Sequence, residues 1–542
     1  MLIDRLITHV ARKKNADYLK FTPSSSLDIP PGRALTPTLL YMHIPFCEEL
    51  CPYCSFNRVV FKEDIARAYY HALRKEILMY KDLGYDFQAL YVGGGTPTVL
   101  IDELEQTIYL IKENYHVAEV SVETNPNHLT SSNIERLQNM GVNRLSVGVQ
   151  TFDDGILKAV ERYNKYGSGQ EIAEKIKQTQ GSFDTLNIDM IFNFPTQTME
   201  ILENDLSTLI GLGVDQITYY PLMASAYTQD MMSRKLGVVN YERGNRFYLK
   251  ITRMLSDTYK ASTAWCFSRK DRMVVPSRSG GLTEGAIPSG TYLWDRLRVT
   301  GKGEASSSHG EREGEAPTAR LTEGAIPSST HLWVGDKLRA PVIDLSSSHG
   351  EREGVTPTAR LTEGATRAPD ESNQRLLSRE GEAPRALLGE GATRAPIIDE
   401  YVVNFDEYAG LGSGSIGYLG GSAYANTFDI QSYIDQVNEG KLPIAAKRGF
   451  SINERLSYDF LMKLFGLSLD LEQISIKHHV NAYLHLWPEI LFFRLTGGLK
   501  KSRNMLTLTQ KGQYYWVLMM REFFIGVNNF RDYCRAEMMF KK

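Results

Sequence analysis

The sequence predicts an α/β fold, with a parallel sheet in a closed or partly closed (β/α) barrel and a small helical domain at the end. Short apolar runs alternate with segments of helical period about six times between residues 39 and 220, the pattern of strands joined by crossover helices. Glycines and polar residues follow several apolar runs, and barrel enzymes carry their chemistry at the C-terminal strand ends. Both observations predict a site at one end of the sheet.

The individual elements carry their own local signals. In the first long helix, Ile65, Tyr69 and Leu73 fall on one side, and Gly84 is typical of a helix end. The predicted strands are residues 39–44, 89–92, 117–123, 144–149, 186–191 and 216–220. The predicted helices are residues 65–83, 101–112, 132–140, 172–178 and 199–212.

A cysteine-rich loop follows the first predicted strand. Cys47, Cys51 and Cys54 are spaced C-x3-C-x2-C in a chain that has five cysteines. Thiolates are soft ligands that suit iron-sulfur clusters or zinc. Three are one short of the four that close a structural zinc site, so they leave one position open for a small molecule. The spacing favours an iron-sulfur centre.

Two other interpretations of these cysteines stay open at this point. They form half of a zinc site that His43 or a distant histidine completes, or they are small buried residues without a ligand. Cys266 and Cys534 are isolated in the sequence, so no disulfide framework is indicated and a reducing compartment is expected.

Length and charge exclude several classes of protein. With 542 residues the chain has room for two or three domains. A formal net charge of -3 gives no global attraction to nucleic acid or to an anionic membrane. We find no secretory signal and no convincing membrane span, so we expect a soluble cytoplasmic protein that binds no nucleic acid.

Composition divides the chain into five parts. Residues 1–37 form a leader, 38–270 the barrel, 271–396 an insertion, 397–450 the end of the barrel domain, and 451–542 a helical C-terminal domain. The last part opens with Ser451 and Glu454, which have the spacing of a capping box.

The insertion consists of tandem repeats. The sequence SSSHGEREG begins at Ser306 and returns at Ser346, and LTEGA occurs at Leu282, Leu321 and Leu361. The segment is rich in Gly, Pro, Ser, Glu and Arg and has too few large apolar residues to offset its ordering entropy. We expect a disordered insertion without a catalytic role. Partner binding by the repeats, and inactivation of the protein by them, are the alternatives.

Glycines and polar residues mark the strand ends. The motif GGGTPT begins at Gly93, and its glycines let a backbone approach a ligand closely, although many such triplets are only turns. A carboxylate at Glu123 could bind a cofactor or be merely solvated. The same two interpretations, cofactor binding or simple solvation, apply to Gln150, Arg162 and Asp189. Together with Glu123, these polar residues at or near strand ends favour a binding site.

These motifs resemble a known family. The combination of YxHIPFCxxxCxYC, GGGTPT, Glu123, SVGVQ followed by Arg162, the Asp189 strand and the turn GLGSGS is similar to the radical S-adenosylmethionine family of oxygen-independent coproporphyrinogen III oxidase, including its haem chaperone and anaerobic haem-utilisation relatives. The resemblance implies an incomplete (β/α)6 TIM-like barrel with a small helical C-terminal domain.

The resemblance also implies cofactors and their ligands. Cys47, Cys51 and Cys54 would ligate three irons of a 4Fe-4S cluster, and the fourth iron would bind S-adenosyl-L-methionine. The residues implied to hold that molecule are Tyr41, Tyr53, Gly94, Gly95, Thr96 and Glu123, with Pro221 and Ile416 near its adenine. Gln150, Arg162 and Asp189 match positions that contact a second S-adenosylmethionine in the oxidase. His43 would be near the cluster or a packed strand residue.

The implied function is a radical oxidoreductase that acts on a tetrapyrrole, of the coproporphyrinogen dehydrogenase type, by way of a 5'-deoxyadenosyl radical. The implied partners are a tetrapyrrole or haem and an electron donor such as flavodoxin or ferredoxin. Two departures favour the haem chaperone or the haem-degrading methyltransferase instead. Phe56 stands where the oxidase has a further cysteine, and Asn164 stands where its helix motif has histidine.

Overall fold

The computed structural model describes residues 2–24, 38–272 and 401–539. The repeats predicted to be a disordered insertion (271–396) lie almost entirely outside these residues, as do residues 25–37 of the predicted leader. In the described part of the chain, no helix is both long enough and apolar enough to cross a membrane.

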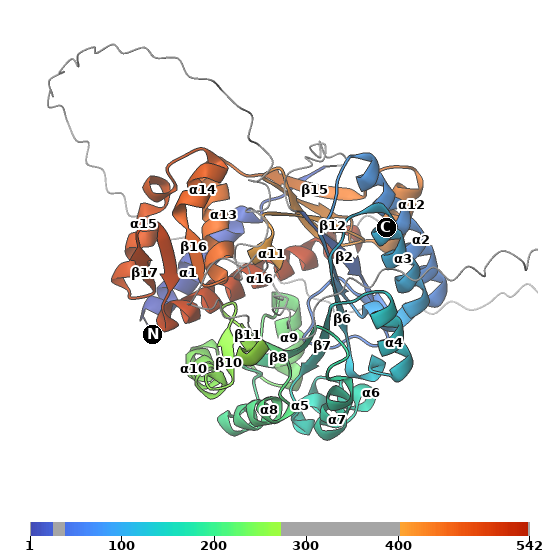
Figure 1. Ribbon diagram of the computed structural model, residues 1–542, viewed down its shortest axis with the longest axis horizontal. Helices are drawn as coiled ribbons and strands as arrows, with labels where there is room; N and C mark the ends of the chain where they lie inside the picture. The colour runs from blue at the N-terminus through green and yellow to red at the C-terminus, as the bar shows by residue number, and fades with distance from the viewer. Residues whose placement is uncertain (1, 25–37, 273–400, 540–542) are drawn as a thin grey trace, which may run out of the picture. The chain divides into compact units, whose positions relative to one another are not determined.

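Six parallel strands form the centre of the molecule, and they lie side by side in chain order (Figure 1). They are β2 (Thr38–Ile44), β5 (Ala89–Gly94), β6 (Glu119–Thr124), β7 (Arg144–Gln150), β8 (Thr185–Phe192) and β9 (Gln216–Pro221). The helices between them are α2 (Glu63–Asp82), α3 (Ile101–Asn114), α4 (Ser131–Asn139), α7 (Gly169–Thr179) and α8 (Met199–Leu212). All eleven predicted elements are present, with ends within three residues of the expected ones. The α/β prediction is confirmed.

Further strands extend the sheet at both edges and leave it open. Strand β12 (Glu407–Leu411) pairs in parallel with β2, and β13 (Ile416–Leu419), β14 (Ser422–Asn426) and β15 (Ile444–Gly449) follow it in antiparallel order. At the other edge, β11 (Cys266–Arg269) and β10 (Tyr259–Ala261) pair beyond β9. The barrel is therefore incomplete, as the resemblance implied.

Alternation along β2 separates two environments. Leu40, Met42 and Ile44 belong to the main hydrophobic core beneath the helices. Leu39 and Tyr41 belong to a smaller cluster with Ala89, Tyr91 and Tyr408, on the opposite face of the sheet. We call this second face the inner face, and the side chains of the candidate site project from it.

The C-terminal part contains more strand than the sequence indicated. Helix α13 (Ile452–Phe465) begins with the predicted capping box, in which Ser451 and Glu454 bind each other's backbone N–H. It is followed by β16 (Ser468–Asp470), α14 (Leu471–His478), α15 (Ala482–Leu495), β17 (Leu499–Ser502), β18 (Met505–Leu508) and α16 (Gln510–Met539), and the three strands form a small sheet.

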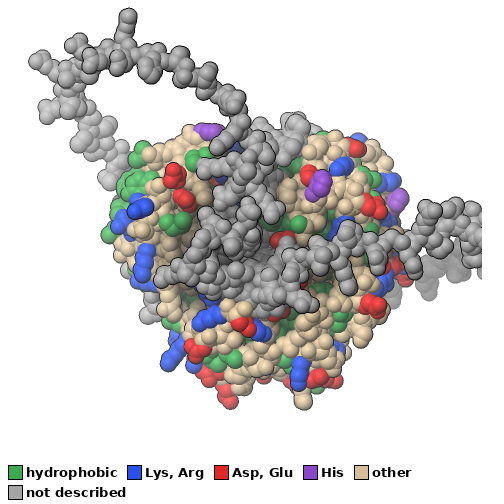
Figure 2. Space-filling view, in the orientation of Figure 1, with side chains coloured by type: hydrophobic (Ala, Val, Ile, Leu, Met, Phe, Trp, Pro, Cys, Tyr) green, Lys and Arg blue, Asp and Glu red, His purple; other side chains and the backbone are tan. Residues whose placement is uncertain are grey.

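The outer side of α15 is apolar. Leu484, Trp487, Leu491 and Leu495, spaced three or four residues apart, are all substantially exposed. Figure 2 shows hydrophobic side chains gathered at the edge of the molecule where α15 lies in Figure 1.

The N-terminal segment contains a helix that the sequence analysis did not predict. Helix α1 (Leu2–Tyr18) packs along α16, where Arg12 Nε donates to Glu522 Oε2 at 3.0 Å. The start of the predicted leader is thus packed against the last helix of the chain.

Candidate functional site

The cysteine loop begins at the carboxyl end of β2 and is closed at its base by a short parallel pairing. Strand β3 (Phe46–Cys47) pairs with β4 (Val59–Val60), and Phe61 N donates to Cys47 O at 2.8 Å. Within the loop, Cys54 N donates to Cys51 O at 3.2 Å, so these two cysteines share a tight turn. The parallel strand end and the short pairing place all three thiols beside the inner face.

Arg58 ties the loop together from within. Its Nη2 donates to Cys51 O at 2.5 Å and to Cys54 O at 2.6 Å. Burial lowers the pKa of Arg58, but the negative charge of Cys54, Cys51 and Cys47 outweighs burial and raises it. The three cysteines therefore lie within electrostatic reach of one cation. We did not predict Arg58, because a basic residue in a loop normally indicates a solvated position.

The donor set fits an iron-sulfur cluster better than a single ion. Within residues 2–24, 38–272 and 401–539, no three His, Cys, Asp or Glu side chains lie close enough together for one metal ion. A cluster does not require that, since each cysteine binds a different iron atom. His43 does not complete a zinc site, because its two ring nitrogens lie 2.9 Å from Tyr41 Oη and 2.7 Å from Asn57 O.

His43 is a packed and neutral strand residue. It is fully buried, and burial, with a contribution from the Arg531 charge, lowers its pKa to about 4. Of the two roles considered for His43, the structure supports packing, with Tyr41 held in place by the same hydrogen bond.

The glycines after β5 form a cradle that only glycine can build. A Cβ on Gly93 would lie 2.7 Å from the Glu123 carboxylate, and one on Gly95 would lie 2.6 Å from Phe46 O. Gly94 has a φ of 114°, a conformation that favours glycine. Its N–H donates to Glu123 Oε2 at 3.1 Å, and Tyr91 Oη donates to Glu123 Oε1 at 2.9 Å. Glu123 and the start of the cysteine loop therefore pack directly against the glycine backbone.

Thr96 joins the cradle to the cysteine loop. Its Oγ1 donates to Cys47 Sγ at 3.7 Å and accepts from Asn125 Nδ2 at 2.8 Å. Asn125 follows β6 directly, and the sequence analysis did not single it out, although its place two residues after Glu123 at a strand end was the available signal.

Arg162 is buried against the cysteine loop. Its Nη1 donates to Cys51 Sγ at 3.6 Å and to Tyr53 Oη at 3.3 Å, and its Nη2 donates to Asn125 Oδ1 at 3.1 Å. The side chain is 3% exposed, and its Nε has no hydrogen-bond partner among the described residues. An orphaned buried donor beside Cys51 is what an absent bound group would satisfy.

The structure separates the other predicted residues. Gln150 ends β7 in a left-handed conformation with a φ of 78°, at a register shift against β8. Asp189 accepts from Ser146 Oγ at 2.7 Å and from Asn187 Nδ2 at 2.8 Å. Gln150 lies on β7, next to the strand of Glu123, and Asp189 lies one strand further on β8. Pro221 ends β9 at the far side of the parallel strands.

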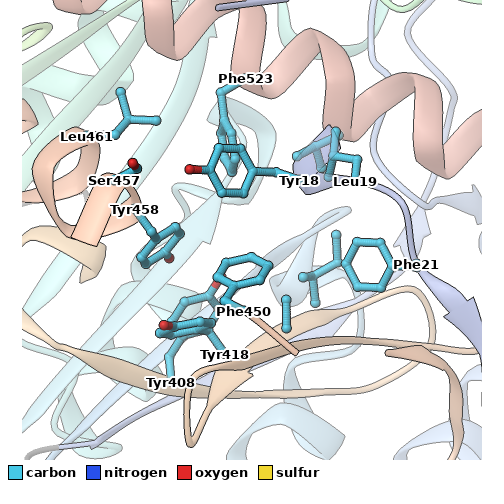
Figure 3. Close-up of a pocket in the computed structure, with 13 residues that line it drawn as sticks. Tyr18, Leu19, Phe21, Tyr408, Tyr418, Phe450, Ser457, Tyr458, Leu461 and Phe523 are labelled. Atoms are coloured by element: carbon cyan, nitrogen blue, oxygen red, sulfur yellow. The ribbon is translucent and has the colours of Figure 1, made fainter. Parts of the chain in front are cut away.

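Ile416 lies in an aromatic pocket. The pocket is lined by Tyr408 and Tyr418 of the extended sheet, by Tyr458 of α13 and by Phe523 of α16 (Figure 3). The lining also includes Ile416 and Val527 but none of the residues of the cysteine loop. An apolar wall beside the inner face is compatible with an adenine or with another flat ring.

Glu76 of α2 supports the glycine turn between β12 and β13. Its buried carboxylate accepts hydrogen bonds from Gly412 N at 2.9 Å, from Tyr433 Oη at 2.6 Å and from Asn426 Nδ2 at 3.0 Å. Burial raises the pKa of Glu76 to about 7, although the three hydrogen bonds lower it. Sequence reasoning missed this residue, because a glutamate within an amphipathic helix normally faces water.

We expect Glu76→Gln to change how stability depends on pH. The pKa of Glu76 in the folded protein, about 7, lies above the ordinary value of 4.5. The stabilising contribution of the protonated Glu76 to the free energy of unfolding is therefore fully present below pH 4.5 and is lost as the pH rises through 7. The variant lacks this titration. Its free energy of unfolding, relative to the unchanged chain, should therefore rise by up to about 3 kcal/mol between pH 4.5 and pH 8.

Urea unfolding at several pH values measures this difference. Glu200→Gln, at an exposed position in the first turn of α8, controls for the loss of one negative charge. A difference between Glu76→Gln and the unchanged chain that stays constant from pH 4.5 to 8 would show that Glu76 does not titrate in this range.

Comparison with known proteins finds similarity in the central segment of the chain. Residues 41–209 match the model of the radical SAM superfamily. The heme chaperone HemW of Bacillus subtilis is 32% identical over 195 residues, which is 35% of this chain and 51% of that protein. The oxygen-independent coproporphyrinogen III oxidase of Bradyrhizobium diazoefficiens is 31% identical over 201 residues, or 36% of this chain and 44% of that protein.

The chain thus spans about half the length of the curated relatives it matches. Among solved structures, coproporphyrinogen III oxidase (HemN) from Escherichia coli superposes with a TM-score of 0.59 at 18% identity, covering 93% of this chain and 95% of that one. This likeness shows the same fold.

Proposed function

We propose that this chain, whose residues 41–209 are a radical SAM domain, is an oxidoreductase that acts on a tetrapyrrole in the manner of coproporphyrinogen dehydrogenase. The observation that carries the proposal is the convergence of the cysteine loop, the glycine cradle and Arg162 at the carboxyl ends of adjacent parallel strands. Similarity to proteins named for coproporphyrinogen or heme supports the choice of substrate class.

Proteins of this superfamily use a 4Fe-4S cluster and S-adenosyl-L-methionine, which together supply reductive cleavage of a sulfonium and abstraction of a hydrogen atom from the substrate. In our proposal, Cys47, Cys51 and Cys54 hold the cluster. Arg58 keeps two of these cysteines in one turn through their carbonyl oxygens.

In our proposal, the remaining predicted residues bind and orient S-adenosylmethionine. Glu123 and the backbone of Gly94 and Gly95 would hold the polar groups of S-adenosylmethionine, and Tyr41, Tyr53 and Thr96 would complete the cradle. We assign Gln150, Arg162 and Asp189 to the polar wall next to it, and Pro221 and Ile416 to the adenine side. Gly94, Thr96, Arg162 and Pro221 are buried, and the other assigned residues are partly exposed.

A second candidate is a haem chaperone that binds the cluster and haem without turning over a porphyrin. Two observations favour it. Several relatives bear the name heme chaperone, and Phe56 occupies the place of the oxidase's additional cysteine.

One assay distinguishes the two candidates. The reconstituted, reduced full-length protein is incubated without oxygen with S-adenosylmethionine and coproporphyrinogen III. The oxidase-type function predicts 5'-deoxyadenosine that depends on the porphyrinogen, with protoporphyrinogen as product. Tight haem binding, with neither 5'-deoxyadenosine nor protoporphyrinogen formed, would contradict the oxidase-type function and support the haem chaperone. Failure to bind haem or porphyrin at all would overturn both.

A further inference from the structure

The last turns of α16 lie against the cysteine loop. Arg535 Nη1 donates to Phe56 O at 3.0 Å, and the guanidinium carbon of Arg531 lies 5.1 Å from the centre of the Phe56 ring. Asn528 Nδ2 donates to Met223 O at 2.9 Å, and Asn529 Oδ1 accepts from Ala226 N at 2.9 Å. The C-terminal helix is therefore anchored both to the cysteine loop and to the segment that follows β9.

Arg531 is a buried cation in this position. Arg531 is 8% exposed, and its Nη1 donates to Asn528 Oδ1 at 3.0 Å. Partners within the protein, Asn528 among them, offset the loss of water from this buried guanidinium. Its geometry is planar and forked, which matches a carboxylate with two parallel hydrogen bonds.

The charge of Arg531 acts on the inner face of the sheet. Burial and then the Arg531 charge lower the pKa of His43. Burial raises the pKa of Tyr408 to about 12, while a hydrogen bond from Tyr458 and the Arg531 charge oppose that rise. His43 is on β2 and Tyr408 is on β12, so the guanidinium lies within electrostatic reach of two neighbouring strands beside the candidate cofactor site.

Apolar surface adjoins this cation on two sides. Phe56 is 44% exposed, whereas its neighbours Ser55 and Asn57 are 5% and 3% exposed. Along α16, Val527 precedes Arg531 by about one helical turn and lines the aromatic pocket of Figure 3. A flat aromatic molecule that carries carboxylates at its edge matches a cation placed between aromatic surfaces.

We infer that Arg531 binds a carboxylate of the substrate, with Phe56 packing against the attached ring system. This inference rests on the proposed function, because it takes the substrate to be a tetrapyrrole with carboxylate side chains. It adds a residue of the C-terminal helix to a site otherwise built by the barrel. The carboxylate of S-adenosylmethionine is the competing occupant, and the test must separate the two.

The experiment compares binding of coproporphyrin III with binding of its tetramethyl ester to the reconstituted full-length protein, followed by fluorescence quenching in one detergent-containing buffer. We expect Arg531→Gln to weaken binding of the acid about tenfold to a hundredfold, since a hydrogen bond to a charged group is lost. Binding of the ester should not change, and Arg531→Lys should recover part of the affinity for the acid.

Arg535→Gln is the matched control, because it removes a cation of the same helix end that contacts only the Phe56 carbonyl on this loop and Asp532 on its own helix in the described contacts. It should leave the affinity for the acid within about twofold. Thermal unfolding and iron content of each variant show whether the protein is folded and loaded.

Four results would overturn the inference. Equal weakening of acid and ester by Arg531→Gln would show that the residue only packs. Unchanged affinity for the acid, with porphyrin still bound by the unchanged chain, would remove Arg531 from the site but leave the proposed function standing. Weakened binding of S-adenosylmethionine alone would assign Arg531 to the cofactor. If the unchanged chain binds neither porphyrin, the proposed function fails together with this inference.

Discussion

Cys51→Ser is expected to abolish the iron-sulfur cluster. A serine hydroxyl is a hard and weakly acidic ligand that replaces a soft thiolate poorly. Cys51 is also held on both sides, since Arg58 binds its carbonyl oxygen and Arg162 approaches its sulfur at 3.6 Å. Iron should fall from about four atoms per reconstituted chain to a small fraction of that, and the electron paramagnetic resonance signal of the reduced cluster should disappear.

Cys266→Ala provides the control for this experiment. Cys266 is buried in β11, outside the cysteine loop, and its replacement should leave iron content and the resonance signal unchanged. If the signal of Cys51→Ser equalled that of the control, the three-cysteine assignment would be wrong.

Arg162→Gln is expected to damage both the loop and the electronic properties of the cluster. The substitution leaves acceptors such as Gly148 O, Asn125 Oδ1 and Tyr53 Oη without their buried donor. Each buried group left unsatisfied costs about 1–3 kcal/mol. Loss of a positive charge near Cys51 also favours the oxidised cluster, so the reduction potential should move to a more negative value.

Urea unfolding and a redox titration followed by electron paramagnetic resonance measure the two effects separately. Arg136→Gln is a suitable control, because Arg136 is a partly exposed residue of α4 that pairs with Glu105. A potential for Arg162→Gln that equals that of the control would mean that Arg162 lies too far from the bound cluster to affect it.

Much of the fold could be predicted from local sequence patterns that span only a few residues. The alternation of apolar runs and amphipathic segments predicted six strands and five helices correctly, because each signal lies within a few residues of the element it specifies. The short helix α5 (Asp154–Ala159), the N-terminal helix α1 and strands β13–β15 were not predicted. Helix α1 packs against α16, at the other end of the chain, which no local pattern reveals. Strands β13 and β14 form a local hairpin, and the sequence analysis did not use its glycine turn at Gly420 and Gly421.

The candidate site shows the same division. The three cysteines, the glycine triplet and Glu123 were found from the sequence, because a metal-binding loop and a strand end are recognisable where they occur. Arg58 and Asn125 were missed although they are close to these motifs. Their side chains bind backbone or neighbouring side-chain atoms, and the residue type alone does not reveal that.

By itself, the sequence determined the order of the six strands along the chain and the position of the cysteine loop, and it showed the motifs of the radical SAM superfamily, whose model residues 41–209 match. Only the tertiary structure decided which distant residues surround that loop: Arg162 at Cys51, Glu76 beneath the turn at Gly412, and Arg531 over Phe56. The physical reason is that each of these contacts joins groups more than a hundred residues apart. Only the folded chain brings them together, and a charged side chain that folding buries requires such a partner.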